Sequence, residues 1–109
     1  MDDVITLVSI TNDQKDKDGF NKEKTVKVEI FADVESTKRS EYYSAKRAGI
    51  DIDLTITINA EDFELANQIN AKEEVVEASE LIFENKKYKI MRIYKKDEFK
   101  IELTCKRSV

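Results

Sequence analysis

The chain has 109 residues, with 19 Lys and Arg against 23 Asp and Glu, a single Cys, and no His, Pro or Trp. Without His there is no imidazole general base, no Ser-His or Cys-His nucleophile pair and no His-ligated zinc. One Cys cannot form an internal disulfide or a Cys-cluster metal site. One domain spanning residues 1–109 is expected at this length. The composition favours a binding or structural role without a metal or cofactor, and not an enzyme.

The net charge of −4 argues against general duplex-DNA binding, because phosphate neutralisation by Lys and Arg supplies most of that affinity. It does not exclude a protein that surrounds DNA. Apolar runs are only a few residues long, and the start Met1-Asp2-Asp3 lacks the basic region of a signal peptide. A soluble, cytosolic product is therefore expected.

The first half of the chain predicts two strands. Residues 4–11 are mostly β-branched and end at Asn12, so they predict a strand. Residues 12–23 predict a polar loop around Asp18-Gly19. Residues 25–35 alternate between apolar and mostly charged positions, which predicts a long half-buried strand.

The middle of the chain predicts one inserted helix and a further strand. Residues 39–49 contain helix formers, with Ser40 as N-cap and Gly49 as a stop. Residues 52–58 alternate and predict a strand with one wet face. Residues 60–68 predict a short helical or turn segment that brings Phe63 and Leu65 onto the core. Residues 70–78 are highly charged and predict no defined element.

The C-terminal third predicts two hairpins. Strands at 80–84 and 88–94 flank a turn at 85–87, and a turn at 95–98 leads into a strand at 99–106. The predicted register pairs Tyr94 with Phe99, Ile90 with Leu103 and Tyr88 with Cys105. About six locally connected strands with one inserted short helix predict a mainly β fold, a small antiparallel barrel or sandwich.

Several patterns have both a functional and a structural interpretation. The run 16–19 (DKDG) is similar to part of an EF-hand loop, but the first and twelfth positions are Gln14 and Thr25 where acidic ligands are required. A solvated turn with glycine at positive φ is the preferred interpretation. The loop's length still marks it as a candidate functional segment.

Carboxylates at Asp51, Asp53 and 61–62 lie on the polar side of alternating patterns, so a solvated surface is favoured over a catalytic pair. Cys105 alternates with Leu103 and is expected to be a buried small hydrophobe.

Three further features bear on binding. Arg92 is predicted on the strand face of Tyr88, Ile90 and Tyr94, where it pairs with a carboxylate or stacks between tyrosines, or contacts a partner. Lys and Tyr interleave near the C-terminus, as in some OB-fold nucleic-acid surfaces, although nearby acidic residues offset this charge. On a helix, adjacent tyrosines at 42 and 43 cannot both point inward, so one is expected at an interface.

The order of four short motifs resembles the phage head-tail connector proteins of the head-closure family, also called stopper or head-tail adaptor proteins. The motifs are ADVE at 32–35, RSEYYSA at 39–45 followed by Gly49, YKIMRIY at 88–94 and IELT at 101–104. The resemblance covers roughly residues 4–107, and it departs from the family at 70–78, which is longer and more acidic.

The resemblance implies a β-barrel subunit of a ring below the portal of a phage or prophage, which joins head to tail and helps retain packaged DNA. It implies a portal-side connector and a tail-side protein as partners, self-association into a ring, and passage of DNA without sequence-specific binding. It implies a virion location after assembly in the host cytoplasm, with segment 37–50 as the element that faces the channel or a neighbour. The candidate partner-contact residues are Arg39, Glu41, Tyr42, Tyr43, Arg92, Asp18, Gly19 and Phe20.

Two alternatives remain at this point. One is an OB-like module that binds single-stranded nucleic acid, and the other is a cytosolic protein-interaction domain.

Overall fold

A computed structural model describes residues 1–15, 17–36 and 53–108. Six antiparallel strands form a closed barrel in the order β1-β2-β3-β8-β7-β6. This confirms the predicted mainly β class and selects the barrel over the sandwich. The barrel strands are β1 (Asp3–Lys15), β2 (Asn21–Ser36), β3 (Leu54–Asn59), β6 (Glu80–Phe83), β7 (Lys86–Lys95) and β8 (Lys100–Arg107).

The barrel interior is filled by the apolar halves of the alternating strands. Side chains that share an inward face are fully or almost fully buried, including Ile5 and Leu7 of β1, Ile56 and Ile58 of β3, and Leu103 of β8. The helix α2 (Ala60–Glu64) follows β3 directly and contributes the buried Phe63 to this core. The prediction for 60–68 is therefore correct for Phe63, but it is wrong for Leu65, whose side chain is exposed.

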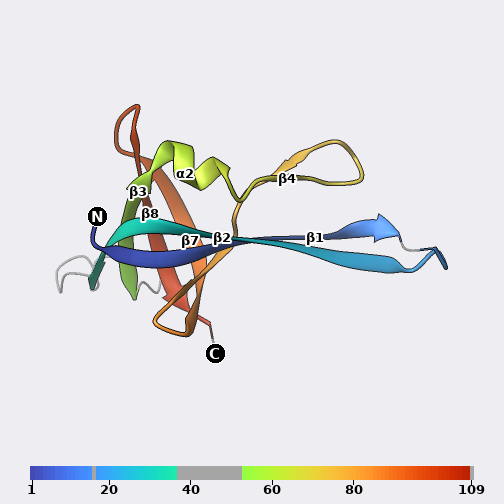
Figure 1. The fold of residues 1–109 in the computed structure, drawn as a ribbon, viewed down its shortest axis with the longest axis horizontal. Coiled ribbons are helices and arrows are strands. Elements are labelled where there is room, and N and C mark those ends of the chain that lie inside the picture. The colour runs from blue at the N-terminus through green and yellow to red at the C-terminus, as the bar shows by residue number, and fades with distance from the viewer. Residues whose placement is uncertain (16, 37–52, 109) are drawn as a thin grey trace, which may run out of the picture.

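The predicted polar loop at 12–23 is wrong, because β1 and β2 continue as a two-stranded hairpin well beyond the barrel. Their pairing runs from Asp3 opposite Ala32 to Lys15 opposite Asn21, with a register shift between Thr11 and Gln14. Figure 1 shows this hairpin as an extended arm, and the molecule measures 51 × 29 × 25 Å. The alternation of apolar and polar residues that predicts a strand ends at Asn12, because both faces of a hairpin outside the core can be polar. We call residues 10–15 and 21–26 the arm and residues 17–20 its tip.

The segment that gave no prediction, 70–78, belongs to a second small hairpin. β4 (Gln68–Ile69) pairs antiparallel with β5 (Val75–Val76). Between them the Asn70 side-chain oxygen accepts hydrogen bonds from the backbone N–H groups of Lys72 and Glu74, each at 2.9 Å. This hairpin leaves the barrel on the same side as the arm (Figure 1).

The β6–β7 connection is one residue earlier than predicted. Glu84 and Asn85 form the turn with φ of 51° and 62°, the left-handed values that the tightest hairpin turns require. Lys86 already belongs to β7.

The predicted register between β7 and β8 is wrong. Ile90 lies opposite Cys105 and Ile93 opposite Leu103, and the register shifts between Ile90 and Arg92. Phe99 lies in the turn, where the Asp97 carboxylate accepts hydrogen bonds from the N–H groups of Phe99 and Lys100 at 2.7 and 2.9 Å. The shift and the longer turn break the predicted pairing of Tyr94 with Phe99. Tyr94 and Phe99 therefore project into solvent, although Tyr88 is buried as expected.

The predicted helix at 39–49 and the whole of segment 37–50 lie outside the described residues.

Candidate functional site

The candidate contact residues fall into three groups. Arg39, Glu41, Tyr42 and Tyr43 lie outside the described residues. Asp18, Gly19 and Phe20 form most of the arm tip, and Arg92 lies on β7 of the barrel. The arm extends away from the barrel (Figure 1), so the structure does not bring Arg92 together with the tip.

The tip is a tight turn that presents an aromatic side chain. Gly19 has a φ of +83°, which confirms the predicted glycine conformation, and an added Cβ there would have no heavy atom within 4 Å. Phe20 is 71% exposed. A partner that covers this side chain would gain the free energy of removing apolar surface from water.

A buried polar network holds the base of the arm against the second hairpin. The Ser9 hydroxyl donates to the Ala66 carbonyl at 2.5 Å, and the Gln68 side-chain amide donates to Ser9 Oγ at 3.1 Å. The same amide group donates to the Lys24 carbonyl at 3.1 Å, and Gln68 Oε1 accepts from the Thr11 hydroxyl at 3.3 Å. One glutamine therefore connects both strands of the arm to the segment that follows α2.

The network gives the arm a defined direction. A two-stranded hairpin is marginally stable in water by itself, whereas Ser9, Thr11 and Gln68 are all buried and all satisfied. Farther out, the Asp13 carboxylate accepts a hydrogen bond from the Ala71 N–H at 3.3 Å. Buried polar groups with complete partners favour one geometry over alternatives.

This network was not predicted, although the sequence contains one sign of it. Ser9 and Thr11 continue the inward face of Ile5 and Leu7, so two polar side chains occupy core positions of a strand. Such positions require buried hydrogen-bond partners. The sequence does not indicate Gln68 as their partner, because this residue follows the helix in a segment without hydrophobic periodicity.

A second exposed surface lies at the end of β7 and the start of β8. Tyr94 is 64% and Phe99 73% exposed, and Met91 and Ile93 are also exposed. Arg92 is exposed and lies opposite Thr104, so it does not share the buried face predicted for it. Lys96 forms an ion pair with Glu102 at 3.6 Å, which offsets part of the basic charge beside these aromatics.

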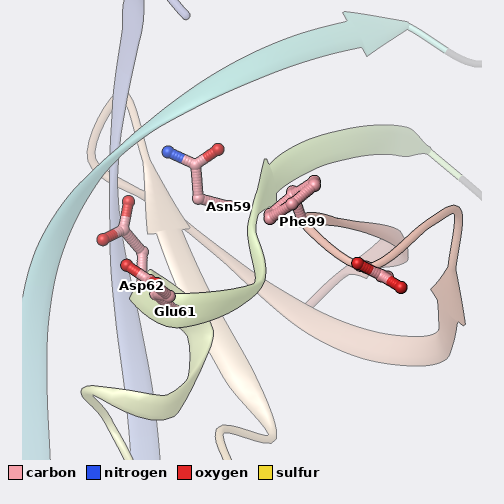
Figure 2. Close-up of a pocket in the computed structure, with 5 residues that line it drawn as sticks. Asn59, Glu61, Asp62 and Phe99 are labelled. Atoms are coloured by element: carbon pink, nitrogen blue, oxygen red, sulfur yellow. The ribbon is translucent and has the colours of Figure 1, made fainter.

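An acidic hollow of about 360 Å³ adjoins Phe99. Asn59, Glu61 and Asp62 line it from the junction of β3 and α2, while Phe99 lies across from them in the β7–β8 turn (Figure 2). Glu98 completes the lining. The Ala60 N–H donates to the Phe99 carbonyl at 2.7 Å, which holds the two segments together. Glu61 is exposed and Asp62 half-buried, in keeping with the solvated interpretation of this pair.

The chemistry available in the described residues is limited. They contain no group of three or more acidic or Cys side chains that could hold a metal ion. Cys105 is fully buried, and burial raises the pKa of its thiol to about 12. A thiol with that pKa is almost entirely protonated near neutral pH and is a poor nucleophile. The prediction of Cys105 as a buried small hydrophobe is confirmed.

Compared with known proteins, the chain matches no family model and gives no significant match to a curated sequence. Among the described residues, no helix combines the length and hydrophobicity needed to cross a bilayer.

Proposed function

We propose that this protein is a structural subunit of a phage or prophage head-tail connector, which joins a ring below the portal and links head to tail. The observation that carries the proposal is the arm, a braced polar hairpin that ends in the exposed Phe20. The arm extends beyond the barrel and does not cover its core, but it can reach a neighbouring subunit. The ordered motifs that resemble the head-closure family support the same role.

In this role the arm contacts other proteins of the particle, namely the portal-side connector, the tail-side protein or a neighbouring subunit. The chain resides in the host cytoplasm before assembly and in the neck of the virion afterwards. Its charge suits a ring around DNA, because a net charge of −4 gives little affinity for a polyanion that must slide through.

Deleting the gene from its phage or prophage tests the proposal. Purified particles are compared by electron microscopy and mass spectrometry, with the wild-type gene supplied on a plasmid as control. We expect tailless heads and free tails in the deletion, and the chain itself among the proteins of complete wild-type particles. Normal yields of tailed, infectious particles without the chain would refute the role.

A second candidate function is binding of single-stranded nucleic acid at the β7–β8 end of the barrel. The observation that favours it is the exposure of Tyr94 and Phe99 beside Arg92, Lys95 and Lys100, because exposed aromatics flanked by cations can stack on bases. Asp97, Glu98 and Glu102 oppose it by repelling phosphates.

Filter binding of single-stranded DNA at low salt separates the two candidates. If this function holds, the wild type binds and a Tyr94→Ala, Phe99→Ala double variant loses at least about tenfold in affinity, since base stacking contributes about 1–3 kcal/mol per base. Absence of wild-type binding at low salt eliminates the candidate.

A further inference from the structure

The outer edge of β2 carries a long run of backbone without a strand partner. β1 pairs with β2 over residues 21–32, but β3 pairs only with Asp33–Ser36, so within the described residues the second edge of β2 is open from Asn21 to Ala32. The Gln68 side chain that bonds the Lys24 carbonyl approaches from the side of β1, where it also bonds Ser9 and Thr11, so it does not occupy this edge. Open edges offer N–H and C=O groups on which another strand can assemble.

We propose that the occupant of this edge is a second copy of the same chain, paired antiparallel β2 to β2 about a two-fold axis at Thr25. In that register Glu23 of each copy lies opposite Lys27 of the other, which gives two ion pairs related by symmetry. Glu23, Thr25 and Lys27 lie on one face of β2, and all three side chains are exposed. Within each copy the Thr25 hydroxyl donates to Glu23 at 3.3 Å, which orients that carboxylate along the strand.

Charge excludes the neighbouring registers. An axis at Lys27 places that lysine against itself, and an axis at Val26 places Glu23 opposite Glu29. Like charges directly opposite one another are destabilising in antiparallel pairs. An axis at Val28 pairs Lys27 with Glu29 but opposes Glu23 to Asp33, which already lies opposite Thr57 of β3.

The same register covers exposed apolar surface on both copies. It places the arm tip, through Gly19, opposite Phe31 of the second copy, whose side chain is 63% exposed and lies across from that of Val4, which is 50% exposed. A hollow of about 210 Å³ lined by Val4, Glu29, Ile30 and Phe31 marks this position. Each tip therefore reaches an apolar patch on the other barrel, and the two contacts are equivalent by symmetry.

The inference is independent of the proposed connector role. A two-fold pair is not the contact between neighbours in a cyclic ring, so it describes a state of the isolated protein. Its failure would leave the deletion experiment untouched.

Two charge-reversed variants test the register by sedimentation. Glu23→Lys creates two Lys–Lys oppositions in the pair, and Lys27→Glu creates two Glu–Glu oppositions, so each variant alone should dimerise at least about tenfold more weakly than the wild type. In a mixture, a Glu23→Lys copy and a Lys27→Glu copy oppose Lys to Glu at both positions. The mixture should therefore recover wild-type affinity, whereas Lys86→Glu, a reversal on β7, should leave it unchanged.

A cysteine probe tests the axis directly. Thr25→Cys places two thiols across the two-fold axis, and a short bismaleimide should link the copies in high yield. Asn12→Cys, on the other strand of the arm, should link poorly, and Cys105 is fully buried in the barrel. A wild type that sediments as a monomer at the highest attainable concentration would overturn the proposal. So would a dimer that ignores both charge reversals and their mixture.

Discussion

Gln68 is the residue on which the direction of the arm most depends, and Gln68→Ala is the most informative single substitution. It removes the two hydrogen bonds donated by the side-chain amide, to Ser9 and to the Lys24 carbonyl, and the one accepted from Thr11. At about 0.5–1.5 kcal/mol for each of the three net hydrogen bonds, the expected loss is about 1.5–4.5 kcal/mol. The upper part of that range applies if the Thr11 hydroxyl remains buried without a partner.

The loss should affect the base of the arm more than the rest of the barrel, because the network lies beyond the residues of β1 that pair with β6. Amide hydrogen exchange should accelerate at the base of the arm, in residues 7–11 and 24–28, by about thirtyfold for a 2 kcal/mol loss. Exchange in β3 and β8 should change least. Urea denaturation gives the global value, and Asn12→Ala on the exposed part of β1 is the matched control.

Two outcomes would contradict this role of Gln68. If Gln68→Ala lowers stability by less than about 0.5 kcal/mol and exchange in both segments stays at the wild-type rate, the network does not hold the arm. If exchange accelerates equally in every strand, the network supports the barrel as a whole, and the arm has no independent anchor.

Three further predictions concern the core, the tip and the buried thiol. Phe63→Ala should cost about 3–5 kcal/mol by denaturation, whereas Leu65→Ala, exposed on the same segment, should change stability by less than about 0.5 kcal/mol. Gly19→Ala should cost about 1–2 kcal/mol through its positive φ alone, since nothing lies near an added Cβ, and Gly19→Asn should cost less in the same assay. Cys105 should resist a thiol reagent in the native state. Since its folded pKa of about 12 exceeds the unfolded value of 9.0, stability is level below about pH 9 and falls by up to about 1.4 kcal/mol per pH unit as pH rises toward 12.

The barrel could be predicted from the sequence because its strands have one face in a core. The alternation of Val28, Ile30 and Ala32 with mostly charged residues, and of Ile56 and Ile58 with polar residues, follows directly from an interior on one side and water on the other. The β7–β8 register could not be predicted in this way. Its shift between Ile90 and Arg92 is a local insertion that leaves composition unchanged, and it moves every later side chain relative to the partner strand.

The arm was missed for the opposite reason. Beyond Asn12 the hairpin leaves the core, so apolar alternation disappears while backbone pairing continues. Polarity without periodicity is the usual signature of a loop, and it cannot be distinguished by composition from a strand with two wet faces. The exposed Phe20 was identified only because the segment was judged too long for a simple turn.

The position of the polar residues carries more information than their number. Ser9 and Thr11 are polar on a face that is otherwise apolar, and that local contradiction marks the place where the barrel core ends and the braced arm begins. Polar residues on an inward face are costly unless partners are supplied, so their presence implies a second segment packed above them. Here that segment is the hairpin of β4 and β5, for which the sequence predicted no element. Polar residues on the inward face of a strand therefore indicate this network, which no sequence motif marks, because a projection from the barrel departs from the pattern that builds its core.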